Sequence, residues 1–234
     1  MSTTLEGTEG GNIVGISLSD GTYTFLDWTG TGIIPTDNYI VYTAGLVTRG
    51  IRSAKQESSG LPAGHYDIST ERYFQEFDTS GISRTPVSAT FDPWIVNDTN
   101  DTAAMICVET KFETDGALEK TDYDNHLTLG YTAKVYTEIL PADSNHGRKN
   151  MSFTQDGLDA IGNLDKLQMV CLEYDFDYLR VEPTSLPTSR YTNFYPEIGA
   201  GDMGLGPTLT YTMGNEHKIS SGKVNIDGGK VTIK

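Results

Sequence analysis

Three carboxylates, Glu173, Asp175 and Asp177, alternate with aromatic residues in the segment QMVCLEYDFDYL, residues 168–179. This alternation predicts a β-strand, in which residues two apart lie on one face with a spacing of about 6.6 Å. Two carboxylates at that spacing fit a glycoside hydrolase if they line a cleft. A straight strand does not bring oxygens together as Ca²⁺ requires. Since nothing in the sequence indicates a cleft, we favour a solvated acidic strand face.

Other candidate sites are weaker. The segment TDYDNH, residues 121–126, has two Asp, an Asn and a His but lacks the Gly and the final Glu of a calcium-binding EF-hand loop. The four His residues are scattered without the spacing of zinc ligands. Neither a phosphate-binding glycine loop nor a nucleophile elbow is present. We therefore expect a protein that is not an enzyme and that holds no metal or cofactor.

The two cysteines, Cys107 and Cys171, each lie in a segment that is expected to be a strand. One interpretation is a disulfide between neighbouring strands. The other is a pair of reduced, buried thiols that pack as small apolar side chains. We favour the second, because the N-terminal segment MSTTLEGTEGGN lacks the basic and apolar parts of a secretory signal.

The elements that must position these residues are mostly strands. The segment 103–140 contains two alternating arms around a polar connection, 114–125, and predicts a long antiparallel hairpin. In its second arm, Leu127, Leu129, Tyr131, Ala133, Val135 and Ile139 are expected on one face. A single helical pattern covers 152–167, with Thr154 as the N-cap and Asp156 in the first turn. We therefore predict an antiparallel β-sandwich or barrel with one short flanking helix.

The remaining segments suggest an arm, a loop and an extension. Residues 1–11 are polar and predict a flexible tail that a neighbouring subunit would hold. Residues 49–64 predict a long exposed loop, whose Arg49, Arg52 and Lys55 make it the most basic part of the chain. We expect a core over 1–181 and a C-terminal extension over 182–234 with a terminal hairpin around Asp227, either as an added module or as part of the same domain.

Composition limits the partners. The 234 residues include 32 acidic and 17 basic residues, which gives a formal net charge of −15. DNA binding depends on Lys and Arg, so this chain is expected to repel nucleic acid rather than bind it. No apolar run approaches the length of about 20 residues that crosses a bilayer, so we expect no membrane span.

The long hairpin at 103–140, the lone helix near 154–166 and the acidic strand at 168–179 together resemble the major tail, or tail-tube, proteins of bacteriophages. The resemblance implies a virion subunit, assembled in the host cytoplasm with other virion proteins, that forms stacked hexameric rings. DNA would pass through the bore without specific binding. For this chain it implies acidic residues facing the bore, at Glu109, Glu113, Glu173, Asp175 and Asp177. It also implies that Arg49, Arg52 and Lys55 contact a neighbouring subunit.

Three alternatives remain open at the level of sequence. A capsid decoration or cement protein would also be acidic and rich in β-structure, but would form trimers. A carbohydrate-binding or adhesin module would use exposed Trp28, Trp94 and tyrosines as stacking platforms. A hydrolase would use the carboxylates of 168–179.

Overall fold

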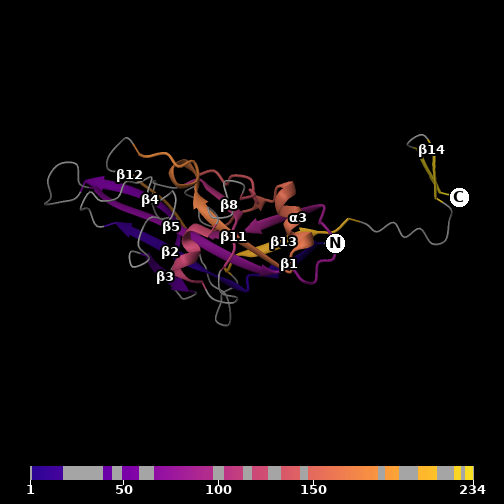
Figure 1. Cartoon of the computed structure of the whole chain (residues 1–234), viewed down its shortest axis with the longest axis horizontal. Coiled ribbons are helices and arrows are strands. Elements are labelled where there is room, and N and C mark those ends of the chain that lie inside the picture. Colours follow the sequence, from indigo (N-terminus) through magenta and orange to yellow (C-terminus); the bar gives the residue numbers. More distant parts are fainter. Residues whose placement is uncertain are drawn as a thin grey trace.

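The structure is a computed structural model, and it describes residues 2–17, 39–43, 49–57, 66–96, 103–112, 118–125, 133–142, 147–183, 188–194, 205–214, 224–227 and 230–233. In these residues the protein is mainly antiparallel β-sheet, with α3 (Gln155–Asn163) as its one α-helix (Figure 1). The predicted fold class, a β-sandwich-like architecture with one short flanking helix, is confirmed.

The smaller sheet has four strands. Its order is β1 (Ser2–Glu6), β13 (Thr208–Thr212), β6 (Ser88–Asp92) and β10 (Met151–Ser152), with antiparallel pairing throughout. Two neighbouring rows across these strands show why the sheet has one apolar face. Leu5, Leu209, Phe91 and Met151 are in register and join the core, whereas the next row contains Thr4, Thr210, Thr90 and Ser152.

The larger sheet is built around β5 (Tyr66–Asp78), a strand of 13 residues. The strand β2 (Glu9–Ser17) runs along one side of β5, while β4 (Arg49–Glu57) and then β11 (Lys166–Glu173) pair with successive parts of it. The sheet continues outward through β3 (Tyr39–Thr43), β8 (Met105–Glu109), β12 (Thr188–Phe194), β7 (Trp94–Ile95) and β9 (Gly147–Arg148).

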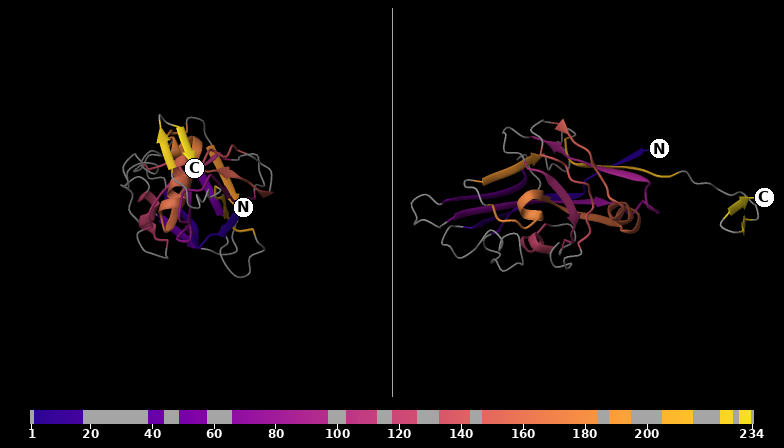
Figure 2. Two further views of the ribbon diagram at one scale, coloured as in Figure 1. Left: turned by 90° about the vertical axis from the view of Figure 1, so that its right-hand side faces the viewer. Right: turned by 90° about the horizontal axis from the view of Figure 1, so that it is seen from above.

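The centre of the larger sheet is buried on both faces. Along β5, Tyr73 and Phe77 point into a core shared with the smaller sheet and α3, and Phe74 points into a second core on the opposite face. This second core lies beside two short helical turns, η2 (Lys120–Asp124) and η3 (Tyr174–Tyr178). Because side chains alternate along a strand, one apolar strand can serve both cores. Figure 2 shows α3 at the same end of the body as the N-terminus.

The two arms of the expected hairpin run antiparallel. Met105 and Leu140 exchange backbone hydrogen bonds of 2.9 Å, and the Cys107 carbonyl accepts from the N–H groups of both Tyr136 and Thr137. This double acceptance marks an irregularity of the bulge type, which changes the faces of the residues that follow. As a result Tyr136 and Thr137 are both buried, and Ile139, which was expected on the apolar face, is 42% exposed. Residues 113–117 and 126–132, with Leu127, Leu129 and Tyr131, lie outside the described residues.

The helix begins as expected and is shorter than its pattern. The Thr154 side chain accepts a hydrogen bond from the Gly157 N–H, and Asp156 lies in the first turn. The helix ends at Asn163, since Leu164 already has an extended backbone, and β11 begins at Lys166. Gly162 lies against a neighbouring segment so closely that an added Cβ would be 2.5 Å from the Thr85 Cα.

Two predicted irregular segments are strands instead. Within residues 1–11, predicted as a tail held by another subunit, β1 pairs with β13 of the same chain and β2 begins at Glu9. Within 49–64, predicted as a loop, 49–57 forms β4 between β5 and β12. Small and polar residues dominate both segments, and tertiary pairing overrides that weak local preference.

The C-terminal region contributes strands to both large sheets. β12 pairs with β4 and β7, and β13 pairs with β1 and β6, so these strands share the sheets of residues 1–181. The predicted terminal hairpin is present as β14 (Val224–Asp227) and β15 (Lys230–Ile233), which form a separate two-stranded sheet. The extension over 182–234 therefore includes strands that complete the main sheets.

Candidate functional site: a buried ion pair beside two short helical turns

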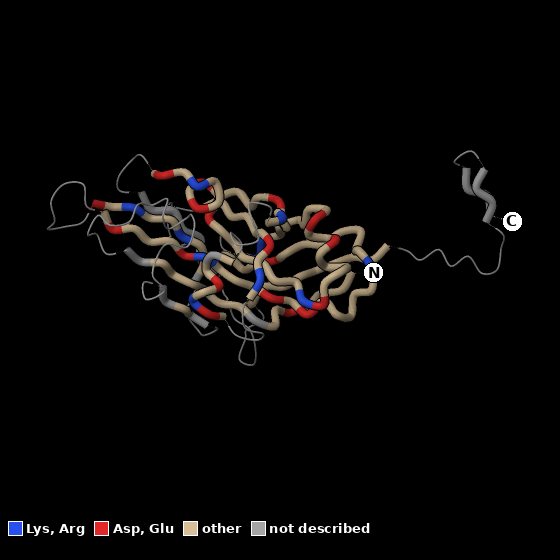
Figure 3. Tube along the Cα trace, viewed as in Figure 1, with Lys and Arg blue, Asp and Glu red and all other residues tan. Residues whose placement is uncertain are grey.

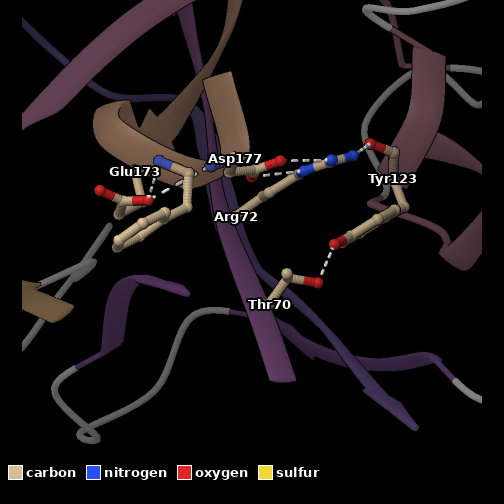
Figure 4. Close-up of polar contacts among 6 residues, drawn as sticks. Thr70, Arg72, Tyr123, Glu173 and Asp177 are labelled. Atoms are coloured by element: carbon tan, nitrogen blue, oxygen red, sulfur yellow. Dashed lines mark hydrogen bonds and ion pairs between the residues drawn. The ribbon is translucent and has the colours of Figure 1, made fainter. Parts of the chain in front are cut away.

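Glu173 is the last residue of β11 and the N-cap of η3, and its side-chain carboxylate caps this turn. It accepts hydrogen bonds from the backbone N–H groups of Asp175 at 2.8 Å, Phe176 at 2.8 Å and Asp177 at 3.2 Å. Figure 4 shows Glu173 beside Asp177. The first N–H groups of a helical turn lack partners within the turn, and an acidic side chain at this position satisfies them. The expected strand over 168–179 is therefore wrong beyond Glu173, and the three carboxylates do not form a row on one strand face.

Glu173 is fully buried. Burial raises the pKa of its carboxyl group above the ordinary value of 4.5, and the hydrogen bonds from the three backbone N–H groups act in the opposite direction. The desolvation of the charged form is the larger of these effects, so the net pKa shift is upward. Glu173 is thus a capping group inside the protein rather than a surface acid.

Asp177 forms an ion pair with Arg72 of β5. The Arg72 Nε donates to Asp177 Oδ2 at 2.9 Å and its Nη2 donates to Oδ1 at 2.7 Å, so the contact is bidentate (Figure 4). Arg72 is 0% exposed and Asp177 is 2% exposed. The two charges neutralise each other in a region without solvent, where an unpaired charge would be strongly unfavourable.

Tyr123 of η2 completes the cluster. The Arg72 Nη1 donates to the Tyr123 carbonyl oxygen at 2.8 Å, and the guanidinium carbon lies 3.9 Å from the centre of the Tyr123 ring. The Tyr123 hydroxyl is hydrogen-bonded to the hydroxyl of Thr70, which lies two residues before Arg72 on β5. One arginine therefore connects the central strand to both helical turns, by charge, hydrogen bonding and cation–π contact.

This geometry favours a structural role over a chemical one. Both oxygens of Asp177 and three nitrogens of Arg72 are used in contacts within the protein. A group that acts on a substrate must be within reach of it, and these side chains are enclosed. We therefore interpret these contacts as the interactions that hold η2 and η3 against the larger sheet.

The predicted acidic lumen must be corrected at two positions. Glu173 and Asp177 are buried inside a single subunit and do not face a bore. Asp175 is exposed, and Glu109 is partly buried with its carboxylate 3.3 Å from the Lys134 N–H. Glu113 lies outside the described residues. Acidic residues are distributed along the described body rather than gathered in one row (Figure 3).

The predicted basic contact loop is also corrected. Arg49, Arg52 and Lys55 belong to β4, a strand with a partner on each side. Arg52 is exposed, whereas Lys55 is buried, paired with Glu182 and placed with its Nζ 4.3 Å from the centre of the Tyr66 ring. The Lys55 charge is thus satisfied within the subunit.

The structure describes 121–125 of the candidate segment 121–126 and none of the four His residues. The Asp122 carboxylate accepts hydrogen bonds from the Glu119 N–H at 2.8 Å and the Asn125 side chain at 2.9 Å, and so it caps η2. Within the described part of the chain, no group of three or more His, Cys, Asp or Glu residues is arranged to hold a metal ion. Trp94 is half-buried with Arg148 5.9 Å from its ring centre, and Trp28 is not among the described residues.

The sequence did not indicate that Arg72 and Tyr123 belong to one cluster. Arg72 shares a face of β5 with Phe74 and Ile68, and a charged residue between apolar residues of one strand face is a signal of a buried partner. The partner itself could not be deduced, since Asp177 lies 105 positions away.

No helix among the described residues is long and apolar enough to span a membrane. No protein-family model matches the chain, and no curated protein matches it.

Proposed function

We propose that the protein is a structural subunit that associates with copies of itself, most specifically a phage tail-tube protein. The observation that supports this most directly is the open edge of β1. Among the described strands, β1 pairs only with β13, at one end of the smaller sheet. Its residues are exposed except Leu5, which is half-buried against the core.

An open edge strand is usually protected. Lysines, prolines, bulges or a covering segment prevent another chain from pairing with the free N–H and C=O groups. The sequence of β1, STTLE, contains no lysine and no proline, and its pairing with β13 is regular over all five residues. The edge is therefore suited to receive a strand from another subunit by β-augmentation.

The outer face beside this edge is also compatible with a close neighbour. Thr4 and Thr210 lie directly opposite each other with their hydroxyl oxygens 3.2 Å apart, and Thr90 and Ser152 continue the same row. Small uncharged side chains impose neither charge repulsion nor a large loss of side-chain entropy when a partner approaches.

The net charge of −15 suits a tube that conducts DNA. Phosphate groups passing an acidic wall are repelled, so no strong binding slows their passage. With Glu173 and Asp177 assigned to the interior, Asp175 and Glu109 remain as the candidate wall residues that the structure describes, and Glu113 stays a prediction. This role requires neither a cofactor nor catalysis by the chain.

The proposal is tested by negative-stain microscopy and light scattering of the purified protein, with and without Thr4→Lys. Lysine on the edge strand is expected to block strand addition while the subunit still folds. Thr121→Lys is the matched control, because Thr121 is exposed on η2, which is not part of the smaller sheet. We expect hollow tubes or rings for the wild type and the control, and monomers for Thr4→Lys.

Two outcomes would contradict the proposal. One is a wild-type protein that stays monomeric at all concentrations, and the other is a Thr4→Lys variant that assembles as well as the control. Discrete trimers from the wild type would refute the tube and favour a decoration protein.

A further inference from the structure

Cys107 and Cys171 lie directly opposite each other on the neighbouring antiparallel strands β8 and β11. The backbone groups of Cys107 point away from β11. Its N–H donates to the Thr137 side chain at 3.1 Å, and its carbonyl accepts from Tyr136 and Thr137 at 2.9 and 3.3 Å. In an antiparallel ladder the N–H and C=O of one residue point to the same side. Cys107 and Cys171 therefore occupy a non-hydrogen-bonded pair.

This type of pair brings side chains closest together. The two Cα atoms of a non-hydrogen-bonded pair are about 4.5 Å apart, and disulfides join residues whose Cα atoms are roughly 4.4–6.8 Å apart. Both side chains point into the same core, between the two sheets. Both cysteines are free thiols in this structure.

We propose that Cys107 and Cys171 form an intramolecular disulfide when the chain folds or opens in an oxidising environment, and that this bond fastens β8 to β11. In the reaction a small disulfide such as oxidised glutathione is the oxidant. One cysteine attacks it to give a mixed disulfide and one reduced thiol, and the second cysteine then displaces another reduced thiol. Two protein thiols thus lose two electrons and two protons, which the small disulfide takes up.

The surroundings determine when the bond can form. Both cysteines are 0% exposed. Burial, and then contact with Cys107, raises the pKa of the Cys171 thiol, so little reactive thiolate exists in the folded protein. The outer side of β8 is covered by the segment 134–140 through the backbone hydrogen bonds of Met105, Cys107 and Glu109. Oxidation therefore requires that this segment and β8 separate, or that the bond form before the core closes.

Such a bond would stabilise the fold by restricting the unfolded chain. It would close a loop of about 65 residues, counted from Cys107 to Cys171. Reduced protein would accumulate in a reducing cytoplasm, and the bond would form where the environment is oxidising. This inference depends on the strand register and not on the proposed assembly.

The test is to refold the purified full chain in a glutathione redox buffer and in dithiothreitol, and then to alkylate it under denaturing conditions. Mass spectrometry of tryptic peptides is expected to show a 107–171 linkage and a mass loss of about 2 Da only after oxidative refolding. The oxidised protein is expected to melt several degrees higher than the reduced protein. In Cys107→Ala and Cys171→Ala, each studied alone, redox buffer should not change the melting temperature.

The folded protein should be oxidised far more slowly than the refolding protein at the same glutathione concentration. Two results would overturn the inference. In one, both thiols remain fully alkylatable after oxidative refolding. In the other, disulfides form only between chains. Either result can be obtained whether or not the protein assembles into tubes.

Discussion

Replacing Asp177 with Asn should strongly destabilise the protein. The substitution preserves the shape of the side chain but leaves the buried Arg72 guanidinium without its counter-charge, and Arg72 is 0% exposed. Removing one partner of a buried ion pair costs about 3–5 kcal/mol. This corresponds to a loss of roughly two to nearly four orders of magnitude in the folding equilibrium constant. Domains of ordinary stability have only about 5–15 kcal/mol to lose.

Urea denaturation followed by tryptophan fluorescence and circular dichroism measures this effect. With a urea dependence near 3 kcal/mol per molar, at the upper end of the usual range for small proteins, the midpoint should fall by about 1–2 M. The control is Asp175→Asn, which removes the same charge two residues earlier in η3 from an exposed position. Its unfolding free energy should change by no more than about 0.5 kcal/mol.

A double variant separates the loss of the pair from the burial of a lone charge. In Arg72→Met with Asp177→Leu, both charges are removed and the space is filled by apolar groups. This variant should recover most of the stability that Asp177→Asn loses. If Asp177→Asn unfolds at the same urea concentration as Asp175→Asn, the ion pair does not hold η3 on the sheet and the reasoning is refuted.

Two further predictions concern a titrating group and a close approach of backbones. Because burial raises the folded-state pKa of Glu173 above 4.5, its contribution to stability is full below the unfolded pKa and is lost as the pH rises through the folded pKa. The variant Glu173→Gln should lack this part of the pH dependence. The difference in unfolding free energy between the wild type and the variant, measured between about pH 4 and 8, should therefore change with pH. Gly162→Ala should lower stability by about 1–3 kcal/mol, since the new Cβ would lie 2.5 Å from the Thr85 Cα, although alanine is the better helix former. Gly81→Ala is its control, because no atom lies within 4 Å of the added Cβ, and equal urea midpoints for the two variants would contradict the packing argument.

The sequence predicts those features that depend on local patterns. The alternation of Met169, Val170, Cys171 and Leu172 correctly assigns side chains to the two faces of β11, and Thr154 correctly marks the start of α3. It fails where a side-chain contact overrides the pattern. Glu173 caps the helical turn that follows it, so the strand ends there although acidic and aromatic residues continue to alternate in the sequence. The ion pair was not predictable because its two residues belong to segments that meet only in the folded protein.

The same limitation applies to residues 1–11 and 49–64. Neither segment has the apolar alternation of a strand, yet both contain strands because neighbouring segments offer complete hydrogen-bonding partners. Lys55 shows that the environment of a charged side chain is equally hard to predict from such a segment. It looks like a surface cation in the sequence, whereas the structure provides Glu182 and the Tyr66 ring as its partners. Basic residues in a polar segment are therefore a poor guide to an interaction surface.

The pairing of β1 with β13 has a consequence for biosynthesis. Ser2 is in register with Thr212, so β1 leaves the ribosome long before the strand with which it pairs. At a translation rate of about 5–20 residues per second, this delay is roughly 10–40 seconds. During that time β1 has neither its intramolecular partner nor a finished subunit behind it. Nascent chains on one messenger RNA are thus at risk of premature association until β13 has been released.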